Sequence, residues 1–148
     1  MADGERRDPY QGFNYSMEID GIEVAGFTNI TGLTMDTAII EYYDGDSLNT
    51  TVKKIPGITN YSNITCRRGI SEGIDLYEWC KSINDQSREV ERKTITINLL
   101  DDTGAPRKTY TLYEAWPCRY VTSDLDASTS ELAMEEVEFV IEHFETAD

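Results

Sequence analysis

The chain has 148 residues, a length typical of one domain that buries its own core without disulfide bonds. Its formal net charge is −15, which disfavours unaided binding to DNA or to an anionic membrane. No apolar run approaches the length of a membrane-spanning helix. These properties exclude a transmembrane helix and argue against a nucleic-acid-binding domain.

The first residues are polar and charged and predict a mobile arm over 1–9, followed by a single domain over 10–146. The start shows no apolar segment of the secretory kind, so we expect a protein of the reducing cytoplasm. The three cysteines, Cys66, Cys80 and Cys118, are an odd number without CxxC spacing. They predict free, buried thiols.

The first regular element is a β-hairpin. Apolar and polar residues alternate from Phe13 to Asp20, which predicts a strand with one buried face. Asp20-Gly21 is a strong signal for a two-residue turn. The return strand is predicted to run through Ile22 to Ile30, with Gly26 as a possible bulge.

A long stretch over 32–70 is rich in β-branched and aromatic residues and is interrupted by one polar loop. It predicts three extended pieces: a long one opening at Gly32, a second over Val52–Ile55 stopped by Pro56-Gly57, and a third over Asn63–Ile70. A loop of this length in a small domain is usually functional or disordered. The stretch therefore predicts an arm that extends from the domain and contacts a neighbouring molecule.

One helix is predicted, within residues 71–87. Its apolar residues fall at helical spacing and form one stripe: Leu76, Trp79, Cys80 and Ile83. Asp75 and Glu78 are placed as a capping pair at its start. The stripe predicts packing of the helix against a sheet.

The second half of the chain reads as further strands. Thr94–Leu100 is a β-branched strand, 101–106 is a turn, and Tyr110–Tyr113 begins the next strand. Trp116-Pro117 interrupts that strand, so the following segment is either a bent continuation or a new strand. The segment 131–145 fits a helix by propensity and a strand by alternation. We predict a strand, because the preceding strands need a partner.

The triplet Asp102-Thr103-Gly104 follows an apolar strand, as does the catalytic triplet of aspartic proteases. Such enzymes need two carboxylates that share a proton, so Asp102 would act only in a dimer. The same residue types are also common in ordinary β-hairpin turns. We predict a turn here and keep an aspartic-protease-like dimer as the alternative.

No other motif indicates a catalytic, metal-binding or phosphate-binding site. His143 is the only histidine, and neither a metal-binding cysteine pair nor calcium-loop spacing accompanies it. Glycines are scattered and form no phosphate-binding loop. The sequence therefore predicts no catalytic residue, no cofactor and no metal, and indicates a β-rich interaction domain.

Charge is unevenly spread along the chain. All 13 Lys and Arg lie at or before Arg119, and nine acidic residues follow it. This pattern is typical of a solvated acidic face. Its functional interpretation is a face that meets a basic surface on a partner or lines a channel.

Several stretches, in this order and spacing, resemble the inner tube proteins of contractile phage tails and related contractile injection systems, the T4-like tail tube family. The stretches are FNYSMEIDGIEVAGFTNITGL (13–33), IIEYYDG (39–45), VKKIPGIT (52–59), NITCRRGI (63–70), DLYEWCKSI (75–83), ITINLLDDTG (95–104), YEAWPCRY (113–120) and LDASTSELAMEEVEF (125–139). The resemblance covers about residues 10–145.

This resemblance implies a mainly β fold, with two packed antiparallel sheets in a tail-tube-type β-barrel or sandwich and one flanking helix. It implies a structural subunit and not an enzyme. Six copies would form a ring, and rings would stack into a hollow conduit inside a sheath. A secreted effector or adaptor on the same fold is the other alternative.

The resemblance also implies partners and surfaces. The partners would be further copies of the chain, a sheath protein, baseplate or hub and tube-terminating proteins, and cargo protein or DNA in the lumen. Assembly would take place in the bacterial cytoplasm or a virion tail, without stable membrane insertion. The loop over 44–62 would reach an adjacent subunit or ring, with the candidate residues Asp44, Asp46, Asn49, Lys53, Lys54 and Tyr61. Candidate lumen-facing or partner-facing acids are Glu136, Glu138 and Glu142.

Overall fold

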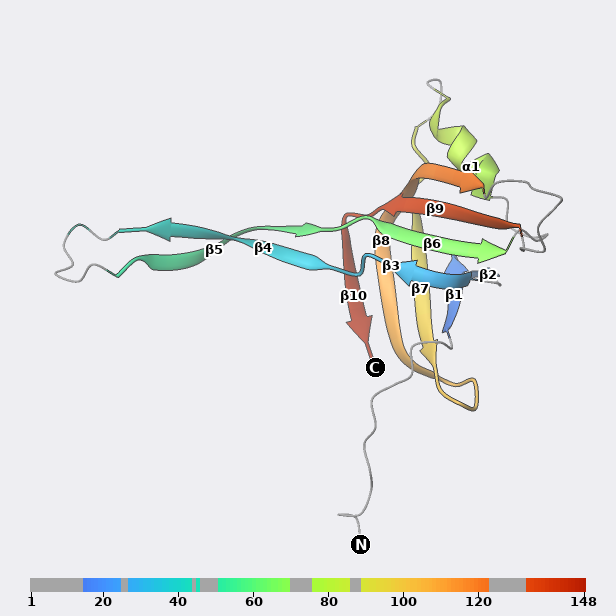
Figure 1. Cartoon of the computed structure of the whole chain (residues 1–148), viewed down its shortest axis with the longest axis horizontal. Coiled ribbons are helices and arrows are strands. Elements are labelled where there is room, and N and C mark those ends of the chain that lie inside the picture. Colours follow the sequence, from blue (N-terminus) through green and yellow to red (C-terminus); the bar gives the residue numbers. More distant parts are fainter. Residues whose placement is uncertain are drawn as a thin grey trace, which may run out of the picture.

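The computed structural model describes residues 15–24, 27–43, 45, 51–69, 76–85, 89–122 and 133–148. This part of the chain is mainly β with one short helix, as predicted (Figure 1). The elements in chain order are β1 (Tyr15–Ile19), β2 (Ile22–Val24), β3 (Phe27–Thr31), β4 (Met35–Tyr42), β5 (Lys53–Tyr61), β6 (Ile64–Gly69), α1 (Leu76–Ile83), β7 (Lys93–Leu100), β8 (Pro106–Thr122), β9 (Met134–Val140) and β10 (His143–Ala147).

The strands form one large and one small antiparallel sheet. Seven strands of the large sheet follow the order β2-β1-β7-β8-β9-β6-β3, and the eighth, β10, pairs with β8. The small sheet is the hairpin of β4 and β5 alone. The predicted fold of packed antiparallel sheets is confirmed.

The large sheet becomes two layers because β8 bends. The first half of this 17-residue strand pairs with β7 and β10, and its second half pairs with β9. Glu114 has a φ of 56° and the register shifts between Pro117 and Arg119, so the strand changes direction between these points. The bent continuation is therefore the correct alternative at Trp116-Pro117.

We call β2, β1, β7, the first half of β8 and β10 the first layer, and the second half of β8 with β9, β6 and β3 the second layer. Strands of the second layer run across those of the first in Figure 1. One apolar core lies between the layers. Its fully buried side chains include Met17, Ile19, Ile64, Leu76, Ile95, Leu112, Val137 and Phe139.

The predicted first hairpin is confirmed, but its return strand is shorter than expected. Asp20 and Gly21 have φ angles of 51° and 81°, the conformation of a type I′ turn. β2 pairs with β1 and ends at Val24. Phe27–Thr31 is a separate strand, β3, which pairs with β6 in the second layer. The prediction of one continuous return strand was wrong, because alternation in the sequence does not reveal a change of partner.

The predicted helix is α1. Leu76 and Trp79 are buried and the rest of the stripe is partly buried, so the stripe packs on the core as expected. The Trp79 ring lies 5.5 Å from that of Phe139, and its Nε1 donates a 2.9 Å hydrogen bond to the Glu91 carbonyl. Asp75, the predicted cap, lies outside the described residues.

The C-terminal segment is a strand, as predicted, but it is divided in two. β9 joins the second layer and β10 joins the first. Val137 and Phe139 alternate inward with Glu136 and Glu138 outward, which explains why strand alternation outweighs helix propensity here. The break at 141–142 carries the chain from one layer to the other.

Candidate assembly surfaces

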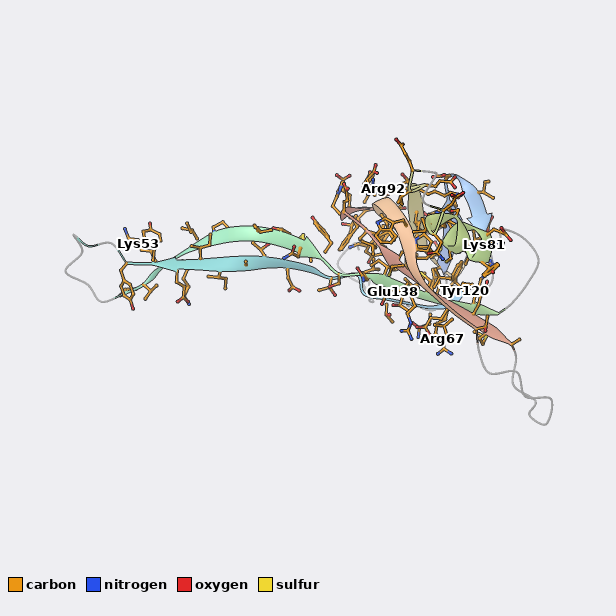
Figure 2. The ribbon with its side chains drawn as sticks, turned by 90° about the horizontal axis from the view of Figure 1, so that it is seen from above. Lys53, Arg67, Lys81, Arg92, Tyr120 and Glu138 are labelled. Atoms are coloured by element: carbon orange, nitrogen blue, oxygen red, sulfur yellow. The ribbon has the colours of Figure 1, made fainter. Side chains whose placement is uncertain are left out.

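The hairpin of β4 and β5 projects far from the two-layered body as an arm (Figures 1 and 2). All eight residues of β4 and most of β5 are exposed. An arm was predicted, but its boundaries were wrong, because Lys53–Tyr61 is a strand and not part of a loop. The strand also continues through Pro56-Gly57, which was predicted to stop it.

A bulge explains how β5 accommodates this proline and glycine. The register shifts between Thr37 and Ile39, which face Thr59 and Pro56 respectively. Proline is tolerated in edge strands and at bulges, and both strands of a two-stranded ribbon are edges. A Cβ at Gly57 would lie 3.1 Å from the Ile40 side chain, so glycine lets the strands approach at the bulge.

Both faces of the arm carry apolar side chains. Successive residues of a strand point to opposite faces, so neighbouring Ile39 and Ile40 lie on opposite sides of the ribbon. Ile39 is 67% exposed and Ile40 is 48% exposed. Further exposed apolar side chains on the arm are Met35, Tyr42, Ile55 and Ile58. An exposed apolar surface of this extent marks a site of interaction with a partner.

The root of the arm is fixed to the body. The Tyr61 ring lies 5.3 Å from that of Phe144 and 6.4 Å from that of His143, both in an edge arrangement. At the other strand, the backbone of Gly32 adopts a φ of 99° and sits against that of Asn63. Tyr61 is half-buried and therefore anchors the arm to β10.

Two other predicted arm residues, Lys53 and Lys54, lie toward the tip. Lys53 begins β5 at the far end of the arm in Figure 2, and Lys54 faces Glu41 across the ribbon. Opposite charges at facing positions stabilise such a pair of strands. Asp44, Asp46 and Asn49 lie outside the described residues.

The three predicted acids lie at two different places in the fold. Glu136 and Glu138 point away from the core on the outer face of the second layer, and Glu142 lies in the link between β9 and β10. Glu136 forms an ion pair with Arg67 at 3.7 Å, and Glu138 accepts a 3.1 Å hydrogen bond from the Cys118 thiol. Arg67 and Glu138 lie on the same side of the body in Figure 2. This face therefore mixes charges of both signs.

A buried ion pair between Arg68 and Glu135 was not predicted. The two residues face each other on β6 and β9 and are 3% and 6% exposed. The Tyr120 hydroxyl donates a 2.6 Å hydrogen bond to Glu135 Oε2, and the Arg68 guanidinium lies 5.7 Å from the Phe27 ring centre. The sequence does contain a signal for this pair. Arg68 and Glu135 stand at alternate positions with the buried apolar residues of their strands, so their side chains point to the core side.

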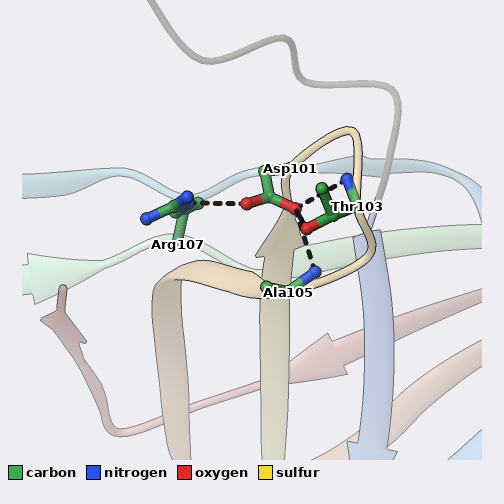
Figure 3. A network of polar contacts seen from close by, with 4 residues as sticks. All are labelled: Asp101, Thr103, Ala105 and Arg107. Carbon is green, nitrogen blue, oxygen red and sulfur yellow. Dashed lines mark hydrogen bonds and ion pairs between the residues drawn. The ribbon is translucent and has the colours of Figure 1, made fainter.

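The Asp102-Thr103-Gly104 triplet forms a turn, as predicted (Figure 3). Its organising carboxylate is Asp101, which accepts hydrogen bonds from the Thr103 hydroxyl at 2.6 Å, the Thr103 amide at 2.9 Å and the Ala105 amide at 3.0 Å. Arg107 Nε donates to the other oxygen at 2.7 Å. These bonds, led by that of the Thr103 hydroxyl, hold the pKa of Asp101 well below its usual range.

All three cysteines are free, but only Cys66 is fully buried. Burial raises the pKa of the Cys66 thiol to about 12. Cys118 is exposed, contrary to prediction, and partial desolvation together with Glu138 raises its pKa to about 11. Within the described ranges, no group of His, Cys, Asp and Glu is arranged to hold a metal ion. A membrane-spanning helix is likewise not found in this part of the chain.

Solved structures of injection-system tubes share this fold. A chain of an extracellular contractile injection system, the PVC sheath–tube complex in its extended state, is 27% identical, with a TM-score of 0.82 over 94% of this chain and 91% of that one. A chain of the anti-feeding prophage tube-terminating cap is 25% identical, with a TM-score of 0.83 over 97% and 93%. Hcp1 from Flavobacterium johnsoniae, at 16% identity and a TM-score of 0.56 over 90% and 94%, shares the fold alone.

A family model provides the decisive comparison. No curated protein matches the sequence. The model of the T4-like virus tail tube protein gp19 matches residues 11–145, which is nearly the whole chain. The family is structural and not enzymatic, so the alternative of an aspartic-protease-like dimer using Asp102 was wrong. The resemblance noted in the sequence is confirmed, and the chain belongs to the T4-like tail tube protein family as a tube subunit.

Proposed function

We propose that six copies of this chain form a ring, that rings stack into a hollow tube, and that the arm makes the contacts between copies. The exposed apolar arm is the observation that carries the proposal. A chain that remained a monomer would leave this surface in water. The number six rests on family membership.

The distribution of apolar residues on the arm supports burial on both sides. Ile39 on one face and Ile40 on the other are both largely exposed in the single chain. A ribbon that only lay on a surface would need apolar residues on one face. The arm therefore lies between two other surfaces, and a tube of repeated copies supplies both.

Strand edges offer a second contact between copies. Within the described residues, β10 pairs only with β8 and β2 only with β1, so each leaves one edge free. Free edges are templates for pairing with another chain. The arm extends beyond the body on the side of β10 (Figure 1), so a copy beside β10 would lie within its reach.

Further partners follow from the related structures. The similar chains come from a sheath–tube complex and a tube-terminating cap, and a more distant one comes from a baseplate. We propose that this tube likewise lies in a sheath, starts at a baseplate and ends at a terminator. Cargo protein or DNA would travel in its lumen, after assembly in the bacterial cytoplasm.

Negative-stain electron microscopy across a concentration series tests the proposal, with Ile39→Ser and Ile40→Ser as variants and Thr59→Ser as the control. The control keeps the hydroxyl that bonds Thr37 at 2.9 Å. The parent and the control are expected to form six-fold rings or stacked tubes. Each isoleucine variant should need at least about tenfold more protein, because a buried isoleucine contributes about 1.5–3 kcal/mol.

Melting temperatures of the unassembled variants separate assembly from folding. Both isoleucines are exposed in the single chain, so their replacement should leave the melting temperature unchanged. Normal assembly of both variants would show that the arm does not join copies. A parent chain that forms no ring under any condition, even with baseplate components, would overturn the proposal itself.

A further inference from the structure

We infer that Cys80 and Cys118 form a redox pair, in which an oxidant of the glutathione disulfide type joins α1 to β8 through a disulfide bond. Both thiols are free in the structure. The bond would lie within one chain, so it forms independently of the proposed tube. Three features of the fold point to it: the direction of α1 along β8, the exposure of the two thiols, and the hydrogen bond that Cys118 makes.

Two ring contacts fix the direction of α1 along the second half of β8. The Tyr77 ring lies 5.7 Å from that of Tyr120. Two residues further along the helix, the Trp79 ring lies 5.5 Å from that of Phe139, which faces Pro117 on β8. The helix therefore advances as β8 is followed backwards, from Tyr120 toward Pro117.

This direction brings the two cysteines to the same level. Cys80 follows Trp79 on the helix, and Cys118 follows Pro117 on the strand. The two thiols are close enough to interact electrostatically: Cys80 is among the groups that raise the pKa of Cys118, after desolvation and Glu138. Ring contacts, strand register and electrostatics thus agree on the position of the pair.

The edge of β8 beside Cys118 is open to the helix. Among the described residues, the pairing of β7 with β8 ends at Ala115, so beyond this point β8 pairs with β9 alone. The register shift between Pro117 and Arg119 places Cys118 at a β-bulge, and bulges re-aim side chains. Cys118 is exposed and Cys80 is partly buried. A soluble oxidant therefore reaches Cys118 first, and Cys80 completes the reaction.

A hydrogen bond holds Cys118 in its reduced form. Its thiol donates to Glu138 Oε2 at 3.1 Å. Desolvation and this carboxylate raise the pKa of Cys118 to about 11, which keeps the thiol protonated at neutral pH. The thiolate is the nucleophile in disulfide exchange, so Glu138 slows the first step. The side chain of Cys118 has to turn from Glu138 toward α1 for the pair to close.

The reaction consumes one molecule of glutathione disulfide. The Cys118 thiolate attacks one sulfur of the oxidant, so a mixed disulfide forms and one glutathione leaves as a thiolate. The Cys80 thiolate then attacks Cys118 Sγ in the mixed disulfide, and the second glutathione leaves. The two cysteines lose two electrons and two protons, and the two glutathiones take them up.

Closure of the pair would tie the helix to the second layer. A disulfide restricts the unfolded chain, so the oxidised chain should melt roughly 5–10 °C above the reduced chain. Thiols stay reduced in a cytoplasm and pair in oxidising surroundings. The bond would therefore stabilise the subunit only after it leaves a reducing compartment.

Peptide mapping of the parent chain tests the pair directly. The folded chain is incubated with glutathione disulfide, remaining thiols are blocked with N-ethylmaleimide in denaturant, and the chain is digested with trypsin without reductant. Cleavage after Lys and Arg separates the three cysteines into peptides 55–67, 69–81 and 109–119. We expect mass spectrometry to find 69–81 joined to 109–119, with maleimide on 55–67, which contains buried Cys66. A disulfide spans Cβ atoms only about 3.5–4.5 Å apart, so the joined peptides report a close approach of α1 to β8.

Two cysteine variants separate the steps of the reaction. Cys80→Ser should stop at the mixed disulfide, with glutathione retained on 109–119, because no second thiol displaces it. Cys118→Ser should leave 69–81 with maleimide, since Cys80 is partly buried. The rise in melting temperature should be absent from both variants.

Glu138→Gln tests the control of the rate. The joined peptides should appear at least about twofold faster than in the parent, because a lower pKa of Cys118 gives more thiolate. Glu136→Gln is the matched control, since Glu136 lies on the same face of β9 and pairs with Arg67. Its rate should equal that of the parent. Equal rates for all three chains would overturn the role of Glu138.

Four results would overturn the pair itself. Glutathione that remains on 109–119 of the parent shows that Cys80 does not reach Cys118. Two copies of 109–119 joined together show that the bond links separate chains. A link to 55–67 shows that the chain opened before it reacted, and maleimide on all three peptides shows that no exchange took place. None of these results bears on the formation of rings or tubes, which the micrographs test separately.

Discussion

At the scale of single residues, the chain places neighbouring arginines in opposite environments. Arg68 is buried with Glu135, and Arg67 is exposed with Glu136. The alternation of a strand produces this difference, because successive side chains point to opposite faces. Two ion pairs between the same two strands therefore differ in burial, and the buried pair has the Tyr120 hydroxyl and the Phe27 ring as additional partners.

Removing one partner of the buried pair should strongly destabilise the fold. We expect Arg68→Met to lower the free energy of unfolding by about 3–5 kcal/mol, because Glu135 would be left as an uncompensated buried charge. Arg67→Met, the control, should cost at most about 1 kcal/mol, since its pair is exposed. Urea denaturation monitored by tryptophan fluorescence measures both values.

A double variant completes this comparison. Arg68→Met with Glu135→Leu should recover most of the lost stability, because no charge is left buried. Equal losses for Arg68→Met and Arg67→Met would contradict the assignment of the buried pair. They would indicate that water reaches both pairs equally.

At the scale of elements, the arm depends on how its root joins the body. β3 leads into β4, and β5 leads into β6, so the two strands of the arm leave from neighbouring strands of the second layer. Gly32 lies at this junction, with a φ of 99° that side chains rarely adopt. Tyr61 packs on β10 at the same root. The contacts of Gly32 and Tyr61 with the body therefore fix the direction of the arm and anchor it.

Gly32→Ala should disturb this junction. A Cβ there would lie 2.1 Å from the carbonyl oxygen of Asn63, so backbone must move. We expect the free energy of unfolding to fall by roughly 2 kcal/mol, and the assembly concentration to rise as the arm is redirected. Gly45→Ala near the tip, where nothing lies within 4 Å, is the control.

Thermal unfolding and the concentration series for ring formation measure the two effects separately. A Gly32→Ala chain with unchanged stability and unchanged assembly would refute the role of this junction. Loss of assembly with unchanged stability would locate its effect in the arm alone.

At the scale of the whole molecule, assembly brings together copies that each carry a formal charge of −15. Repulsion between them opposes association, and the apolar surface of the arm has to outweigh it. Salt screens this repulsion, because the Debye length falls from about 30 Å at 0.01 M to about 8 Å at 0.15 M. Salt therefore controls the balance between single chains and tubes.

We expect the protein concentration needed for assembly to fall several-fold as sodium chloride rises from about 10 mM to about 150 mM. Glu18→Gln with Glu145→Gln, which removes two charges from the outer face of the first layer, should make this dependence shallower. Light scattering during a salt titration measures it. An assembly concentration that rises with salt would instead show that ion pairs between copies dominate.

The sequence by itself determined the class of most elements and the family. Alternation over Tyr15–Asp20, the Asp20-Gly21 turn, the helical stripe around Trp79 and the ordered stretches shared with tail tube proteins are local signals, and the structure and the comparisons confirm them. Such signals are readable because turn geometry and periodic burial depend on residues close together in the chain.

The tertiary structure alone decided which strands are partners and therefore which surfaces are free. The bend in β8, the separation of β2 from β3, the division of the last segment and the burial of Arg68 all depend on pairing between distant segments. Period-two alternation shows that a strand has two faces but not which layer it joins. The extent of the arm and the exposure of both its faces follow from those pairings, because a face is free only where the fold brings nothing against it.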